Sequence, residues 1–456
     1  MPRRKKRKIQ PRSSRKTKLQ APKGTFDILP EDQKYWEQVK RTIKQLASAY
    51  GFSPIDTPIF EDVRLFERGT GATTDIVQKE MYTFRTKGGD HLALRPEFTP
   101  GVIRAYIGHG MKSWPQPVKL YSIGPIFRHE KPQAGRFRQF HQFNLEIIGE
   151  SSAINDVLLI QLVSLIFKKL GIKGFNLQIN SIGCSICRPD YRKLLNDYYR
   201  RQARKLCRNC RERLKVNPLR LLDCKEEKCR QLANNAPQVI DHLCEECHNH
   251  FKEVLETLDE LDVPYILNPY LVRGLDYYTK TVFEFRVKEP ASQPVSQQGG
   301  RGEQGERGEP NSVEIAGGGR YDELVELLGG KLTPAVGIAG GIERVIYVLK
   351  SQDIKVPKEA PPRVFLAQLG ELGRKRSLKL FEEFRSKGLK VAEALSKTSI
   401  KSQLKIADRL GIEIALILGQ KEALEDSIII RDMKSGAQET VSIEKVVNEV
   451  KKKLKK

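Results

Sequence analysis

Hydrophobic residues recur at helical spacing soon after the start of the chain. Trp36, Val39, Ile43 and Leu46 follow one another every three or four residues, and Gly51 comes directly after this stretch. This period matches one face of an α-helix, and glycine commonly ends a helix. The pattern therefore predicts an amphipathic helix that ends near Gly51.

Apolar and polar residues then form strand-like runs separated by turn residues. A proline-bent run at 55–60 predicts an edge strand, and residues 81–98 alternate as two paired strands around a turn at 87–90. Two longer runs, at 118–127 and 137–148, predict a second hairpin. Strands joined by hairpins form antiparallel sheets, so we expect an α+β fold rather than a doubly wound nucleotide-binding fold.

The pattern changes from about residue 183 onward. Residues 183–262 carry cysteine, arginine and helical charge patterns, which predict an inserted helical module; strands resume over 271–287. Residues 290–312 are low in complexity and predict a flexible loop. A proline-containing linker at 351–362 separates a first domain, residues 20–350, from an α/β domain at 363–456.

The chain of 456 residues is basic, with a formal net charge of +24. Ten of these charges lie in residues 1–19, which contain no acidic residue, so +14 remains in the rest. This composition predicts a disordered tail. Composition alone does not decide whether the tail is an RNA-binding arm, a targeting signal or a solubilising segment. The remaining charge favours a polyanionic partner. The sequence contains no run of about 18 consecutive apolar residues, which is the length a membrane span needs. We therefore expect a cytoplasmic protein.

The stretch from Phe127 to Gln142 carries the strongest chemical signal. It reads Phe-Arg-His-Glu, then Lys-Pro-Gln-Ala-Gly, then Arg-Phe-Arg-Gln-Phe-His-Gln, and it includes Arg128, Glu130 and Arg136. Arginine keeps its charge and binds phosphate through a planar fork, so this hairpin suits a nucleoside triphosphate. Considered alone, the arginines also fit a solvated basic hairpin.

Three further segments are glycine-rich or aromatic. Residues 316–322 read Ala-Gly-Gly-Gly-Arg-Tyr-Asp, which is not a phosphate-binding P-loop because no Lys-Ser/Thr follows. Residues 337–344 place glycines before a predicted helix that carries Arg344, which suits a nucleotide lying close to the backbone. Residues 271–278 end in Tyr277 and Tyr278, which would point to opposite faces of a strand.

Taken in order, these segments resemble a known family of enzymes. The helix and strand at 36–60, the hairpin at 127–142 and the segment 337–344 resemble motifs 1, 2 and 3 of class II aminoacyl-tRNA synthetases. Residues 271–278 and 316–322 are similar to the two signature segments of histidyl-tRNA synthetases. The resemblance covers roughly residues 20–456. It implies a class II antiparallel sheet flanked by helices, a helical insertion, an anticodon-binding domain at 363–456 and a homodimer braced through motif 1.

The resemblance also implies a reaction. ATP, with Mg²⁺, would activate L-histidine to histidyl-adenylate with release of pyrophosphate, and the histidyl group would pass to the 3′ end of tRNA(His) with release of AMP. Positioning and charge neutralisation would supply most of the catalysis.

Residue roles follow from matching positions in the motifs. Arg273 and Arg128 would be catalytic, and ATP would meet Arg128, Glu130, Arg136 and Arg344. Histidine would meet Glu97, Phe98, Thr99, Arg128, Gln142, Glu146, Arg273, Tyr277 and Tyr278. The tRNA acceptor end would meet Lys131 and Gln133. We expect His141 to be structural rather than a general base.

All eight cysteines lie between residues 184 and 247, mostly in closely spaced pairs. They are Cys184, Cys187, Cys207, Cys210, Cys224, Cys229, Cys244 and Cys247. This spacing is typical of zinc knuckles, and eight thiolates would suffice for two tetrahedral ions with a structural role. The resemblance, however, implies no general zinc requirement, so both zinc sites and metal-free thiols stay open.

Two other functions would use the same fold. One is the regulatory subunit of ATP-phosphoribosyltransferase, a relative that typically lacks the arginines and the anticodon domain. The other is an RNA-binding or stress-sensing protein, which has no need of a complete set of ATP and histidine ligands. The presence of Arg128, Arg273 and Arg344, followed by residues 363–456, favours the synthetase.

Overall fold

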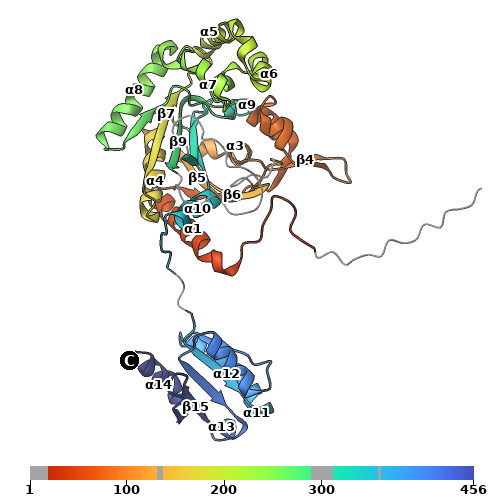
Figure 1. Ribbon diagram of the computed structural model, residues 1–456, viewed down its shortest axis with the longest axis vertical. Helices are drawn as coiled ribbons and strands as arrows, with labels where there is room; N and C mark the ends of the chain where they lie inside the picture. Colours follow the sequence, from red (N-terminus) through yellow and green to blue (C-terminus); the bar gives the residue numbers. More distant parts are fainter. Residues whose placement is uncertain (1–18, 131–136, 289–311, 358–360, 456) are drawn as a thin grey trace, which may run out of the picture. The chain divides into compact units, whose positions relative to one another are not determined.

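A computed structural model describes residues 19–130, 137–288, 312–357 and 361–455. The chain divides between Val356 and Pro357 into two compact units, which we describe one at a time (Figure 1). None of the helices in these residues combines the length and the apolar character that a membrane crossing requires.

The first unit is built on an eight-stranded sheet. Its strands, in spatial order, are β1 (Ser53–Pro54), β5 (Val118–Phe127), β6 (Gln139–Ile148), β11 (Ala335–Gly341), β10 (Ser312–Arg320), β9 (Thr279–Lys288), β7 (Phe175–Ser181) and β8 (Tyr265–Leu267). The outer pairs β1–β5 and β7–β8 are parallel, and the five pairs between them are antiparallel. The expected antiparallel sheet is confirmed.

Four helices bury their apolar sides in the main core with this sheet: α1 (Pro30–Ala49), α4 (Ile154–Leu170), α8 (Glu245–Glu260) and α10 (Ile342–Ser351). The predicted amphipathic helix is α1, which starts with a proline and buries Trp36, Val39 and Ile43. A proline suits the first helical position because its missing N–H would have no partner there.

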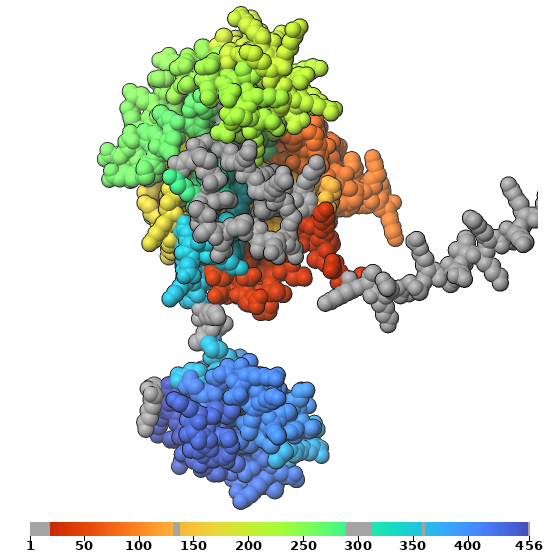
Figure 2. All heavy atoms as spheres, viewed as in Figure 1, coloured from red at the N-terminus to blue at the C-terminus, as the bar shows by residue number. Residues whose placement is uncertain are grey.

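A three-stranded sheet and several short helices also belong to the first unit. The small sheet has the order β2 (Phe60–Asp62), β4 (His91–Leu94), β3 (Thr83–Arg85), and the predicted hairpin over 81–98 is its β3–β4 pair. This hairpin projects from the surface of the unit (Figures 1 and 2). The helices are α2 (Val63–Phe66), η1 (Glu67–Gly71), η2 (Ile76–Glu80), α3 (Thr99–Gly108), η3 (Met111–Ser113) and α9 (Leu324–Leu327).

The segment between β7 and β8 is helical, as expected. It contains α5 (Arg188–Arg201), η4 (Ala203–Lys205), α6 (Arg208–Val216), η5 (Pro218–Leu221), α7 (Glu227–Asn234), η6 (Val239–His242) and α8. Its side chains gather at one end of the unit in Figure 2. Tyr191, Leu195 and Tyr199 from α5 join a buried cluster with Tyr277 and Tyr278, so the insertion packs directly on the segment before β9.

The second unit is a separate α/β fold. Its sheet has the order β13 (Val391–Glu393), β12 (Val364–Gln368), β14 (Ile414–Leu418), β15 (Ser427–Asp432), β16 (Gln438–Ser442). Its helices are α11 (Gly370–Ser386), α12 (Ile400–Arg409), α13 (Gln420–Leu424) and α14 (Ile443–Lys455). The predicted alternation of strands and helices is confirmed, and a distinct apolar core around Val364, Leu416 and Val446 supports the unit.

The prediction of one strand over residues 55–60 was wrong. Only its last residue, Phe60, belongs to a strand, because proline at 54 and 58 interrupts the donors a ladder needs. The Ile55 N–H donates to the Tyr121 carbonyl at 2.9 Å, whereas the Ile59 carbonyl accepts from the Arg95 N–H at 2.8 Å. The segment thus passes from one sheet to the other.

The prediction that a strand begins at residue 271 was also wrong. Residues 271–278 form an irregular turn, and β9 begins at Thr279. Backbone groups of this turn bond elsewhere: the Leu271 carbonyl accepts from the Asn180 amide at 3.0 Å, and the Asp276 N–H donates to the Thr70 carbonyl at 3.3 Å. Tyr277 and Tyr278 consequently do not alternate across a sheet; their ring centroids lie 4.7 Å apart.

Candidate active site

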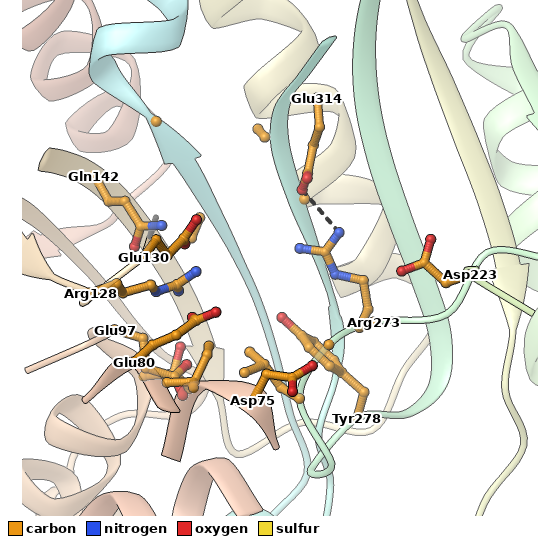
Figure 3. Close-up of a pocket in the computed structure, with 18 of the residues that line it drawn as sticks. Asp75, Glu80, Glu97, Arg128, Glu130, Gln142, Asp223, Arg273, Tyr278 and Glu314 are labelled. Carbon is orange, nitrogen blue, oxygen red and sulfur yellow. Dashed lines mark hydrogen bonds and ion pairs between the residues drawn. The ribbon is translucent and has the colours of Figure 1, made fainter. Parts of the chain in front are cut away.

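A cavity of about 600 Å³ opens over the middle of the large sheet. Its walls come from segments far apart in sequence: the start of α3, the ends of β5 and β6, the 271–278 turn, strands β10 and β11, and the helical insertion. Figure 3 shows Arg128, Glu130 and Gln142 on one side of this space and Arg273 and Glu314 on the other. Such a convergence of charged side chains in one cavity marks the candidate active site.

Most of the predicted site residues line this cavity. They are Glu97, Phe98, Thr99, Arg128, Glu130, Gln142, Arg273, Tyr277, Tyr278 and Arg344. Lys131, Gln133 and Arg136 lie outside the described residues. Glu146 is fully buried beside the cavity and is not among the residues that line it.

Glu97 forms the buried acidic part of one wall. The Tyr277 hydroxyl donates to one of its carboxylate oxygens at 2.7 Å, and the Thr70 hydroxyl donates to the other. Burial raises the pKa of Glu97, while these two hydrogen bonds and the nearby Arg128 act in the opposite direction. A carboxyl group held in this way suits a cationic ligand that enters the cavity.

Glu146 lies behind this wall, on β6. Thr99 donates to one carboxylate oxygen at 2.6 Å, and Tyr321 donates to the other. Burial raises the pKa of Glu146 to about 7, helped by the charge of Glu97 and opposed by the hydrogen bonds. Gly337 on β11 makes room for this carboxyl group, because an added Cβ there would lie 1.7 Å from Glu146 Oε2.

Arg273 lies on the opposite side, held by two carboxylates. One of its terminal nitrogens bonds to Glu314 at 3.0 Å and to Glu284. Burial alone would raise the pKa of Glu314, but the charges of Arg273 and Arg344 hold it at about 2. Gly317 permits this placement, since a Cβ would lie 2.5 Å from the Arg273 guanidinium.

Arg344 and Arg128 approach the cavity from different elements. Arg344, in the first turn of α10, donates to the Glu314 carbonyl at 2.8 Å. Arg128, which follows β5, donates to the Pro96 carbonyl at 3.0 Å and lies over the Phe140 ring. Three guanidinium groups therefore reach one cavity, which suits a polyanion.

Three buried polar atoms in this cavity have no hydrogen-bond partner among the described residues. They are Arg273 Nε, Gln142 Oε1 and Asn144 Oδ1. Buried polar atoms are normally satisfied, so an unsatisfied donor and two unsatisfied acceptors indicate room for a polar ligand. The cavity can thus receive a molecule with both anionic and donor groups.

The two histidines of the hairpin lie outside the cavity lining. His141 Nδ1 lies 3.0 Å from a carboxylate oxygen of Glu343, and its ring packs edge-on against Trp36 at 4.8 Å. His129 packs against Tyr82. Arg320, from the glycine-rich segment, is also structural: it is fully buried and bonds to Asp156.

Several cavity residues had no role in the sequence interpretation. Glu314, Asp75, Arg213 and Arg220 all line the space, and Tyr321 bonds to Glu146. Tyr321 stood inside a quoted segment and was not given a role. The other four carry no local signal, because each enters the cavity through contacts between distant segments.

The insertion contributes its own side of the cavity through α6 and η5. Arg213 and Arg220 reach Asp75 at 3.3 and 2.8 Å, and Asn217 donates to Asp276 at 3.1 Å. The insertion is therefore attached to both the segment before η2 and the 271–278 turn.

In the described part of the chain, the side chains close enough together to hold a metal ion form two sets of four cysteines. Carboxylate oxygens such as those of Glu130 line the cavity itself. Magnesium usually binds through one or two carboxylates together with substrate phosphates, so an ion could enter here with a nucleotide.

Known proteins provide an independent comparison. The family model described as Histidyl-tRNA synthetase matches residues 24–345, and the model described as Anticodon binding domain matches residues 364–453. A histidine–tRNA ligase from Dehalococcoides mccartyi is 46% identical over 436 residues, which cover 95% of this chain and 100% of that protein. One from Acetivibrio thermocellus is 44% identical over 95% of this chain and 99% of its own length.

A solved structure agrees with these relatives. The crystal structure of apo S. aureus histidyl-tRNA synthetase is 33% identical, with a TM-score of 0.75, covering 95% of this chain and 99% of that one. The resemblance drawn from the motifs is thus confirmed, and so is the class II α+β fold. The chain belongs to the histidyl-tRNA synthetase family.

Proposed function

We propose that this chain activates L-histidine with ATP in the 600 Å³ cavity and transfers the histidyl group to tRNA(His). The observation that carries the proposal is that one cavity brings together several cations and several hydrogen-bond acceptors. Arg128, Arg273 and Arg344 supply positive charge, whereas Glu97 and the groups around Glu146 supply acceptors. Histidine and ATP together present the matching pattern of carboxylate, ammonium, imidazole and phosphates.

In the first step a carboxylate oxygen of histidine attacks the α-phosphorus of ATP. The bond from that phosphorus to the bridging oxygen breaks, and pyrophosphate leaves. Mg²⁺, held by carboxylates such as that of Glu130 together with the phosphates, would neutralise part of the phosphate charge. In the second step a ribose hydroxyl at the tRNA 3′ end attacks the acyl carbon and gives its proton to the phosphate of the adenylate. The bond between the acyl carbon and the phosphate oxygen breaks, and AMP leaves. Both steps depend chiefly on positioned charge, and the three arginines supply it without a proton transfer from the protein.

Arg273 is the residue we assign to the reacting carboxylate and α-phosphate. Its ion pairs with Glu284 and Glu314 hold the guanidinium in one orientation, and its Nε has no partner among the described residues. Arg128 would share the α-phosphate, and Arg344 would contact ATP from α10. Fixed orientation is what makes such charges effective in a transition state.

The histidine side is formed by Glu97, Thr99 and Gln142 for the ammonium group. We assign the imidazole to the region of Tyr277, Tyr278 and Glu146. Since Thr99 and Tyr321 already bond to both Glu146 oxygens, Glu146 would act by orienting these two hydroxyls. Buried polar groups arranged for an imidazole would discriminate strongly against side chains that leave them unpaired.

The tRNA would contact two regions. Lys131 and Gln133 would meet the acceptor end, whereas Arg136 would meet the outer phosphates of ATP. Residues 363–456 would bind the anticodon, and the family match at 364–453 supports this role. We retain the proposed domain division: tail 1–19, catalytic domain 20–350 with the insertion at 183–262 and the loop at 290–312, linker 351–362 and anticodon domain.

The chain would act as a cytoplasmic homodimer, where ATP and tRNA are available. Ile59, Phe60 and Phe84 support a dimer, because these large apolar side chains are exposed on or beside the small sheet that adjoins motif 1. Clustered exposed apolar residues commonly mark protein contacts.

Charging of tRNA(His) with radiolabelled histidine tests this proposal. We expect histidine, and no other standard amino acid, to be attached, and Arg128→Ala to lower the rate by at least about 100-fold through lost charge stabilisation. Arg64→Ala, which removes an exposed arginine outside the cavity lining, is the matched control and should leave the rate unchanged. A folded chain that binds tRNA(His) and attaches no histidine would overturn the proposal.

A further inference from the structure

All eight cysteines of the chain collect into two sets of four within the insertion and its junctions. The first tetrad is Cys184, Cys187, Cys244 and Cys247; the second tetrad is Cys207, Cys210, Cys224 and Cys229. Within each tetrad all four sulfur atoms lie within 4.8 Å of one another. The two tetrads differ in how far apart their cysteines lie in the sequence. The first tetrad combines two pairs that are 60 positions apart, whereas all four cysteines of the second lie between residues 207 and 229.

The sulfur–sulfur distances match a single tetrahedral ion. Zinc binds thiolate sulfur at about 2.3 Å, so a regular tetrahedron separates its sulfurs by about 3.8 Å. Cys184 Sγ lies 3.8 Å from the sulfurs of Cys187 and Cys244, and Cys187 Sγ lies 3.9 Å from that of Cys247. In the second tetrad, the Cys207 and Cys224 sulfurs are 3.9 Å apart.

Other uses of these cysteines fit less well. A disulfide requires a sulfur–sulfur distance of about 2.05 Å, far shorter than the contacts of 3.8 and 3.9 Å in the structure. A multi-iron cluster spreads its thiolates over several metal atoms, whereas each of these tetrads is compact enough to share one. Four thiolates also complete a tetrahedral shell, which is typical of a structural site rather than a catalytic one.

Backbone N–H groups support the sulfur atoms in both tetrads. Cys187 Sγ accepts from the Cys184 N–H at 3.3 Å, and Cys184 Sγ accepts from the Ile186 N–H at 3.4 Å. Cys207 Sγ accepts from the Cys210 N–H at 3.3 Å. Hydrogen bonds of this kind orient metal ligands and stabilise their negative charge. We propose that each tetrad binds one structural Zn²⁺ ion, giving two ions per chain.

The first tetrad joins the two ends of the insertion to the catalytic sheet. Cys187 directly precedes α5, and Cys244 directly precedes α8. Arg188, the first residue of α5, donates to the Tyr278 carbonyl at 2.6 Å and to the Gly183 carbonyl at 2.9 Å. An ion at the first tetrad would therefore fix α5 where it contacts the tyrosine turn of the active site.

The second tetrad stabilises the wall that the insertion gives to the cavity. Cys207 and Cys224 themselves line the cavity, and between them α6 and η5 carry Arg213 and Arg220 toward Asp75. Helices of nine and four residues are too short to be stable alone. An ion at the second tetrad would hold them in place.

Metal content of the purified full-length chain tests the proposal. We expect two zinc ions per chain by elemental analysis and native mass spectrometry, after purification without chelators. Cys187→Ser combined with Cys247→Ser, and Cys210→Ser combined with Cys229→Ser, should each leave one ion. These pairs avoid the two cysteines that line the cavity.

Two control variants separate ligand loss from general disturbance. His248→Ala and Arg208→Ala remove exposed side chains next to Cys247 and Cys207, and both should retain two ions. If a paired variant does not fold, the wild-type chain still decides: titration with a thiol reagent should release two zinc ions as eight thiols react. Fewer than one zinc per folded chain, iron in its place, or reaction of all thiols without zinc release would overturn the proposal.

Discussion

The large sheet and the helical insertion are stabilised by different means, although both form walls of one cavity. The sheet is covered by long helices, and its interior contains large apolar side chains such as Phe167, Phe283 and Phe285. A buried arginine of the sheet, Arg320, is paired with Asp156. Between α5 and α8, the insertion consists of helices of at most nine residues, gathered around the second cysteine tetrad.

This difference shows which parts of the site depend on long-range packing and which depend on local chemistry. Strands from 118 to 341 hold Arg128, Glu146 and Glu314 at fixed spacings across a hydrogen-bonded ladder. Arg213 and Arg220 instead rely on short helices anchored near the second tetrad. We therefore expect metal removal to destabilise the insertion. The sheet should instead be destabilised by changes of buried charge and by added side-chain atoms.

The largest expected effect comes from removing metal from the tetrads. Structural zinc sites contribute about 10 kcal/mol of apparent free energy, which would exceed the stability of helices this short. A strong chelator should abolish hydrogen-exchange protection over residues 188–236 and leave β5 and β6 protected. Uniform loss of protection across both regions, or no loss in either, would remove the contrast between them.

The next effect tests buried charge in the sheet. The pKa of Glu146 is raised to about 7 from an ordinary value of 4.5, so between these values only the unfolded chain is ionised at this site. The contribution of Glu146 to the free energy of unfolding is therefore fully present below pH 4.5. It is lost as the pH rises toward 7, by about 3 kcal/mol in total. Glu146→Gln should flatten this part of the profile.

Urea unfolding between pH 4.5 and 7.5 measures this pH dependence of the free energy of unfolding. Both tryptophans, Trp36 and Trp114, lie in the first unit, so their fluorescence reports on that unit alone. The exposed Glu260→Gln serves as the control and should keep the wild-type slope. Equal slopes for wild type and Glu146→Gln would show that this carboxyl group is not titrating in the expected range.

A smaller loss should follow Gly337→Ala. The added Cβ would lie 1.7 Å from Glu146 Oε2, so the strand or the carboxyl group must shift. We expect a loss of about 2 kcal/mol in unfolding free energy, as for an overpacked core, and a higher KM for histidine. Gly108→Ala, near the end of α3 with open space around it, should instead be neutral or stabilising. Equal behaviour of the two variants would contradict the role given to Gly337.

The smallest effect concerns the contact between the two regions. Asp75→Asn removes the partner of Arg213 and Arg220, in partly exposed ion pairs worth about 1 kcal/mol or less. Burial acts to raise the pKa of Asp75, but the three neighbouring cations lower it by more. The Asp75 carboxylate is therefore charged at neutral pH. We expect faster hydrogen exchange over residues 208–221, and no change for Lys79→Gln, which removes an exposed cation paired with the same carboxylate. Unchanged exchange in Asp75→Asn would show that the tetrads alone hold this wall.

Sequence patterns predicted most elements whose partners are near in the chain. The α1 helix, the β3–β4 and β5–β6 hairpins and the second unit all follow local periodicity and turn residues. The 271–278 turn was mistaken for a strand, because its hydrogen-bond partners, Asn180 and Thr70, are distant in the sequence. Local pattern could not reveal them.

The site residues likewise divide into those that local motifs indicate and those that depend on contacts between distant segments. Motif resemblance pointed to Arg128, Arg273 and Arg344, and the cavity collects all three. The carboxylates around Arg273 and the bond from Tyr321 to Glu146 became visible only when strands from distant parts of the chain were paired. The sequence showed the cysteine pairs, but not which pairs share a site.

Histidine-dependent exchange of pyrophosphate into ATP tests the central claim most directly, with the intact chain compared with Arg273→Ala. The account predicts robust exchange that requires histidine and falls by at least about 1,000-fold in the variant, because the lost guanidinium stabilises charge in the transition state. Circular dichroism and metal content should first show that the variant is folded, since Glu284 and Glu314 lose their shared partner. Exchange that persists in folded Arg273→Ala, or its absence from the folded intact chain, would contradict the assignment of this cavity as the site of adenylation.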